Sequence, residues 1–183
     1  MKLVKNLCRI IVGIVFIYSG FVKGIDPSGS DYKFTDYFNA FGMGWMNATT
    51  LFFSFALSLA EFRIGIALLF NLWVSRLAWG SLLFMAFFTP LTLVLALTNP
   101  VSDCGCFGDA MVLTNWQTFW KNIILLLLTI MVFVYRREYK SSLPLMEQFS
   151  FLALAGAGML CLSIYCYHHL PVLDFRPYAV GKN

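Results

Sequence analysis

The sequence is poor in charged residues. Only 12% of its 183 residues are Asp, Glu, Lys or Arg, whereas 60% are hydrophobic, and an average soluble domain carries about twice that charged fraction. A water-soluble fold could not cover so many apolar side chains, but lipid can cover the outer faces of membrane helices. The net charge of +4 comes from short Lys and Arg clusters between apolar runs, not from the continuous basic face that nucleic-acid binding needs. We therefore expect a lipid-embedded protein that does not bind nucleic acid.

Several motifs of soluble enzymes are also missing. No segment resembles a nucleotide-binding fingerprint, and neither an HExxH pattern nor a paired CxxC zinc site occurs. These absences argue against hydrolytic and nucleotide chemistry. The chain has no internal repeat and no low-complexity linker.

Five apolar runs are long enough to cross a bilayer. We predict spans at 3–22, 51–70, 77–97, 116–135 and 149–167. The first run lacks a convincing signal-peptide cleavage site, so we interpret it as a retained helix. The predicted fold is all-α, a polytopic membrane helix bundle.

The basic residues predict the orientation of these spans, because positively charged loops stay in the cytoplasm. They precede the first span and lie between spans two and three and between spans four and five: Lys2, Lys5, Arg9, Arg76, Arg136, Arg137 and Lys140. The opposite flanks are mainly acidic. This pattern predicts a cytoplasmic N-terminus and a periplasmic C-terminus in a bacterial inner membrane.

Aromatic residues in the first outer loop repeat at i, i+3, i+4 and i+7: Phe34, Tyr37, Phe38 and Phe41. This spacing predicts an interfacial helix at about 31–41. Such a helix is either an aromatic anchor at the level of the lipid headgroups or a lid over the next outer loop, which carries two cysteines.

That cysteine loop, 99–115, contains Cys104-Gly105-Cys106. A bond between these two thiols closes a very small ring, which a permissive Gly105 lets the backbone follow, and strain makes such a bond easy to reduce. Thiol-disulfide exchange on an oxidising outer face is the favoured interpretation. Asp103 and Asp109 oppose thiolate formation, and no cationic residue is adjacent in sequence, so any help must come through space.

Two other interpretations of the pair stay open. One is a static disulfide, and the other is a soft-metal site, for Cu(I) for example, in which Met111, His168 and His169 join the two thiols. The two histidines could instead act as a base or form a wet interfacial pair. Of the remaining cysteines, Cys8 is expected to be buried, and Cys161 and Cys166 lie too far apart on one helix to bridge to each other. Cys166 is near the outer end of its span and could approach the Cys104 and Cys106 pair.

Glu61 and Arg63 lie in the middle of the second span, where each charge costs at least about 2.5 kcal/mol. Residues two apart on a helix do not face each other, so each needs a partner on another helix or in a polar cavity. The candidate partners are Tyr18, Ser19, Lys121 and Asn122. Together with Lys23, the two charges form a candidate intramembrane polar site, which is either an interhelical ion pair or a pocket for a quinone ring or a proton path.

Three segments resemble a known group of membrane proteins. Residues 18–27 look like the end of the first helix in DoxX-like proteins, and Glu61 resembles the acidic residue of their second helix. The loop 104–108, followed by Trp116 and by Lys121-Asn122, is similar to the related MauE branch, where an Arg often precedes that Asn. The resemblance covers roughly residues 7–135.

The resemblance implies a four-helix membrane bundle at 1–135 that is associated with redox and disulfide chemistry. The MauE branch is linked to the maturation of a disulfide-rich periplasmic protein. Residues 136–183 add a basic loop, a fifth span and an outer tail, 170–178, which is typical of a connector to a further extracytoplasmic segment.

We therefore predict an inner-membrane thiol-disulfide protein in which Cys104 and Cys106 exchange electrons with a periplasmic protein. A membrane quinone is the hypothesised second electron partner, by analogy with other disulfide-forming bundles. The rival functions are soft-metal handling and a non-catalytic subunit that docks other membrane proteins.

Overall fold

The computed structural model describes residues 2–101, 104–108, 110–141, 143–169 and 171–173. Its elements are α1 (Lys2–Ile25), α2 (Pro27–Ala40), the short 3₁₀ helix η1 (Gly44–Thr49), α3 (Thr50–Leu69), α4 (Val74–Thr98), α5 (Asn115–Val134) and α6 (Leu145–His168). The described residues contain no strand. Five helices are long and apolar enough to cross a membrane, so the prediction of an all-α, multi-pass membrane bundle is confirmed.

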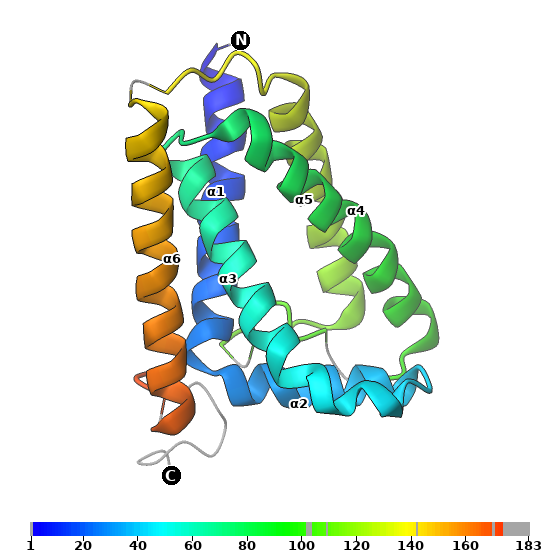
Figure 1. Ribbon diagram of the computed structural model, residues 1–183. Helices are drawn as coiled ribbons and strands as arrows, with labels where there is room; N and C mark the ends of the chain where they lie inside the picture. Colours follow the sequence, from blue (N-terminus) through cyan, green and yellow to red (C-terminus); the bar gives the residue numbers. More distant parts are fainter. Residues whose placement is uncertain (1, 102–103, 109, 142, 170, 174–183) are drawn as a thin grey trace.

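The long helices form two packed groups. Helix α1 packs along α3, with α6 against both, while α4 and α5 pack against each other and α5 also contacts α1. Helix α2 lies across one end of the bundle, which we call the α2 end, and the chain's N-terminus lies at the opposite end (Figure 1). Helix α6 runs toward the α2 end, as an odd number of crossings requires.

Helix α2 is the predicted interfacial helix, but it begins before the expected start at residue 31. Pro27 occupies its first turn, where a missing N–H costs nothing. The Asp26 side chain caps it by accepting a hydrogen bond of 2.9 Å from the Gly29 amide. These two local signals set the start, which the aromatic spacing alone could not show.

Glycines allow α1 and α3 to touch through their backbones. A Cβ atom on Gly65 would lie 2.5 Å from the Ile17 amide nitrogen, and one on Gly20 would lie 2.5 Å from that of Phe62. Backbone atoms cannot move aside as a flexible side chain can, so only glycine fits at these crossings. This close approach is what brings the polar residues of the two helices into one site.

We expect Gly65→Ala to destabilise the protein by about 1–3 kcal/mol, the usual cost of overpacking, because α1 and α3 must separate. Gly158→Ala on α6 is the matched control, since nothing lies within 4 Å of its added Cβ. Thermal unfolding of both variants in detergent measures the difference. Equal melting temperatures would contradict the close packing of α1 on α3.

Candidate functional site

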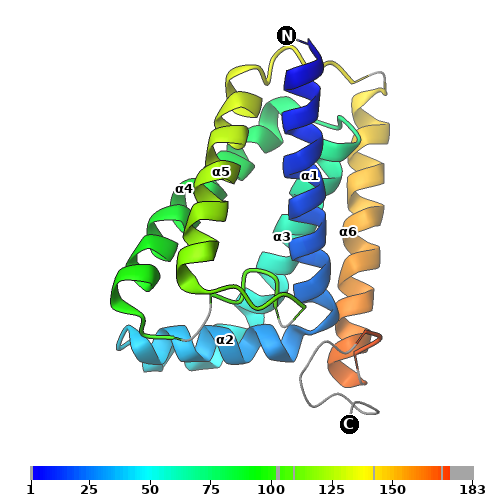
Figure 2. The same cartoon turned by 180° about the vertical axis from the view of Figure 1, so that it is seen from behind.

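The cysteine loop connects α4 to α5 and lies at the α2 end of the bundle, beside the last turns of α1 (Figure 2). Its two ends are tied together by Asn115, whose side-chain amide donates to the Asn99 side-chain oxygen at 2.8 Å and to the Val101 carbonyl at 2.9 Å. Between them the chain turns sharply, with φ of +62° at Gly105 and +53° at Gly108. Glycine adopts these left-handed conformations without steric cost.

This turn brings the two thiols into contact. The Sγ atoms of Cys104 and Cys106 lie 3.1 Å apart, and both residues are free thiols. Cys104 is buried, whereas Cys106 is only partly covered. The pair is therefore placed to donate a hydrogen bond from one sulfur to the other, or to close a bond between them.

Helix α2 covers the loop. The Tyr37 hydroxyl donates a hydrogen bond to the Cys104 carbonyl. The Lys33 side chain packs against Gly105 so closely that a Cβ atom added to this glycine would lie 3.1 Å from Lys33 Cγ. The helix was interpreted as either an aromatic anchor or a lid over the cysteine loop, and these contacts are the ones that a lid requires. Tyr37 reaches the loop because it lies on the aromatic face of α2, and its partner could not be identified from the aromatic spacing.

A buried ion pair joins α1 to α3 below the loop. Lys23 Nζ lies 2.7 and 2.6 Å from the two carboxylate oxygens of Glu61, and both side chains are almost fully buried. Lys23 also donates to Ser19 Oγ at 2.8 Å, one helical turn earlier, and Ser19 Oγ donates to the Cys106 carbonyl at 2.7 Å. A continuous chain of hydrogen bonds therefore runs from Glu61 to the cysteine loop.

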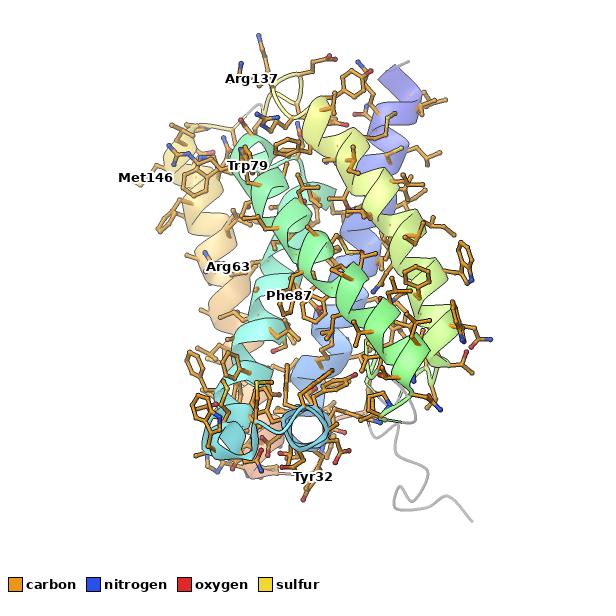
Figure 3. The ribbon with its side chains drawn as sticks, turned by 90° about the vertical axis from the view of Figure 1, so that its right-hand side faces the viewer. Tyr32, Arg63, Trp79, Phe87, Arg137 and Met146 are labelled. Carbon is orange, nitrogen blue, oxygen red and sulfur yellow. The ribbon has the colours of Figure 1, made fainter. Side chains whose placement is uncertain are left out.

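The structure separates Arg63 from this pair. Arg63 lies on the side of α3 that meets α6, where a Cβ on Gly156 would come within 3.0 Å of its Cδ (Figure 3). Of the candidate polar residues, Glu61 and Lys23 come together, and Ser19 joins them. Asn122 instead donates to Thr92 Oγ1 at 3.2 Å, between α5 and α4.

The thiols, the ion pair and Asn122 all line one pocket, which encloses about 740 Å³ including space open to solvent. We call it the central pocket. Its polar part carries three lysines and a single glutamate, Lys23, Lys33, Lys121 and Glu61, and its apolar part is formed by aromatic and aliphatic side chains of α1, α3, α4 and α5. Among the described residues that line this pocket, lysines therefore outnumber carboxylates.

Lys121, which the sequence offered only as a partner for the charges of the second span, lies beside the cysteine loop. It is in the second turn of α5, well after the thiols in sequence, yet its Nζ lies 4.2 Å from the centre of the Phe107 ring. That ring also packs edge-on against Tyr18 at 5.4 Å. The cation is therefore held over the cysteine loop through space, which is the kind of help that the thiols lacked in their own sequence neighbourhood.

The contact between the sulfurs gives the two thiols opposite acidities. The hydrogen bond from Cys104 lowers the pKa of Cys106 to about 6, against the effect of burial and with further lowering by Lys121 and Lys23. The same hydrogen bond, followed by burial, raises the pKa of Cys104. Cys106 is thus the thiolate near neutral pH, and Cys104 is its proton donor.

The residues of the alternative metal site do not gather around the thiols. Met111, His168 and His169 are exposed, and the His169 ring stacks on Tyr165 at the end of α6. Among the described residues, no group of three or more His, Cys, Asp or Glu side chains could hold a metal ion. Cys8 is buried in the core, as expected. Asp103, Asp109 and most of the tail 170–178 lie outside the described residues.

Comparison with known proteins gives one match. The family model described as methylamine utilisation protein MauE matches residues 1–135. No curated protein and no solved structure gave a match. The matched region contains α1 to α5, and therefore every residue of the central pocket.

Proposed function

Because the chain belongs to the family of the methylamine utilisation protein MauE, and because its two loop thiols meet in a pocket lined by lysines, we propose that it is a thiol-disulfide redox protein of the membrane. Cys104 and Cys106 cycle between dithiol and disulfide and exchange electrons with a protein partner outside the cytoplasm. The observation that carries this proposal is the 3.1 Å contact between the two sulfurs. The α2 end then faces the periplasm of a bacterial inner membrane, where disulfides persist.

The proposed exchange proceeds through a mixed disulfide on Cys106. In the direction that oxidises the partner, one thiolate of the reduced partner attacks Cys106 Sγ. The bond between Cys106 and Cys104 breaks, and Cys104 takes up a proton. The second partner thiolate then attacks the partner sulfur of the mixed disulfide, and Cys106 leaves as a thiolate. The partner gains a disulfide and loses two electrons, which the pair gains as a dithiol. A low pKa on the leaving thiol favours this last step.

Cys106 is assigned to the mixed disulfide because it is the more exposed of the two and carries the lower pKa. Buried Cys104 is the leaving thiol of the first step, and in the reverse reaction, which reduces the partner, it attacks Cys106 and resolves the mixed disulfide. The family description supports a partner that belongs to methylamine utilisation, and the chemistry of the site supports one that carries disulfides. Tyr37 and Ser19 hold the loop backbone while the sulfurs react.

The test is the midpoint potential of the Cys104 and Cys106 pair, measured by tagging free thiols across a glutathione redox series. Cations that stabilise the thiolate stabilise the reduced form, so we expect a potential well above about −300 mV, below which structural disulfides lie. Lys121→Met should lower the potential, whereas Lys140→Met, beyond the far end of α5, should leave it unchanged. A value below that limit would identify a static disulfide instead.

A further inference from the structure

The central pocket continues from the thiols into the apolar interior of the bundle. Beyond the cysteine loop its wall contains Phe16 of α1 and the rings of Phe84 and Phe88 of α4, which stack at 4.4 Å; Phe16 packs edge-on against Phe84 at 5.3 Å. Leu57 of α3 and Leu125 of α5 complete this part. These side chains come from four membrane-spanning helices, so the pocket reaches from a redox-active loop into the depth of the bilayer.

Hydrogen-bond donors line the same pocket as the thiols and the aromatic side chains. Asn122 uses its side-chain amide nitrogen for Thr92, which leaves a second N–H for a ligand. Lys121 lines the pocket and has no acidic partner among the described residues. An amide N–H and an ammonium group are donors that suit a ligand oxygen on which negative charge develops.

We propose that the central pocket binds a membrane quinone, which reoxidises the Cys104 and Cys106 dithiol. This inference rests on the proposed function, since a pair that oxidises its partner must afterwards lose two electrons. The apolar aromatic wall fits a quinone ring and its lipid-soluble tail, and the polar donors fit its carbonyl oxygens.

The reaction balances without a further reactant. The two thiols lose two electrons and two protons and form the S–S bond. The quinone takes up both electrons and both protons on its carbonyl oxygens and becomes a quinol. Cys106, which ionises first, starts the electron transfer, and the proton of Cys104 follows when its sulfur closes the bond. The lipid bilayer supplies the quinone and removes the quinol.

The experiment uses the full-length protein in nanodiscs, reduced and made anaerobic, with decylubiquinone as the probe. Phe88→Trp fills the aromatic part of the pocket, and the matched control is Phe87→Trp, because Phe87 precedes it on α4, is 64% exposed and does not line the pocket. Quinol formed per protein and thiol exchange with glutathione are measured on the same samples. We expect the ratio of quinone reduction to thiol exchange to fall about tenfold in Phe88→Trp and to stay at the wild-type value in Phe87→Trp.

A second measurement separates binding from chemistry. The double variant Cys104→Ser and Cys106→Ser should still bind decylubiquinone, seen as quenching of tryptophan fluorescence, while it reduces none. Thiol exchange without quinone reduction in the wild type would overturn the quinone site and leave the proposed function standing. Equal quinone reduction in the two tryptophan variants, or equal displacement of the probe by an acyl lipid that cannot be reduced, would also overturn it. Quinone binding without any thiol exchange would instead refute the proposed function.

Discussion

Replacing Glu61 with alanine is expected to destabilise the protein by about 3–5 kcal/mol, the cost of leaving one member of a buried ion pair without its partner. Lys23 would remain buried on α1 with Ser19 as its only remaining hydrogen-bond acceptor among the described residues. Because Ser19 also holds the Cys106 carbonyl, we expect the cysteine loop to loosen as well. Thermal unfolding in detergent gives the first effect, and the rate of thiol alkylation gives the second.

The surface ion pair of Lys5 and Glu138 is the matched control. Its charged atoms are 2.8 Å apart, but 57% of the Glu138 side chain is exposed. We expect Glu138→Ala to cost no more than about 1 kcal/mol, because water replaces the lost partner. The double variant Lys23→Met and Glu61→Leu should recover much of the stability, since it removes both buried charges. If Glu61→Ala lowers the stability no more than Glu138→Ala does, the pair of Lys23 and Glu61 does not contribute as a buried ion pair should.

Replacing Cys106 with serine is expected to abolish thiol exchange, and replacing Cys104 with serine is expected to accumulate a mixed disulfide. The two variants differ because oxidised glutathione runs the exchange in reverse: Cys106 attacks it and forms the mixed disulfide, and Cys104 resolves that bond. Non-reducing electrophoresis of each variant after incubation with oxidised glutathione measures the difference. A mixed disulfide on Cys104 in the Cys106→Ser variant, together with none on Cys106 in the Cys104→Ser variant, would reverse the assignment of the two thiols.

The pH dependence of thiol alkylation identifies which of the two thiols is the attacking one. A pKa lowered to about 6 means that Cys106 stays ionised down to that pH and loses reactivity as the pH falls further. In the reduced protein with both cysteines present, the rate at which Cys106 is alkylated should therefore rise through pH 6 and then level off. Lys121→Met should move the midpoint upward, toward the ordinary cysteine value of about 8.5. A profile that still rises steeply above pH 8 in the wild type would contradict the lowered pKa.

Local signals predicted the spans and the interfacial helix, and left open whether that helix is an anchor or a lid. An apolar run of about 20 residues is by itself enough to cross a membrane, so five spans could be counted from the sequence, and the described part of the structure contains five helices of this kind. The start of α2 was misplaced because the aromatic spacing reports the buried face of a helix, whereas Asp26 and Pro27 report its beginning. The resemblance to the MauE branch, carried by the cysteine loop, is confirmed by the family match.

The polar site was predicted only in part. The mid-span carboxylate signalled that a partner must exist, because a buried charge is costly. It could not signal that the partner was Lys23 on α1, since the pairing depends on how far α1 slides along α3. That register is set by backbone contacts at Gly20 and Gly65, which no single residue displays in the sequence.

The sequence by itself determined the membrane class, the five helices and the close spacing of Cys104 and Cys106, because hydropathy and covalent neighbourhood are properties of the chain. Only the tertiary structure decided the chemistry around those thiols. Tyr37, Lys121 and the pair of Lys23 and Glu61 come from four different helices, and they converge on one loop through packing. The acidity of a thiol depends on charges within a few ångströms in space, and distance along the chain does not report that proximity.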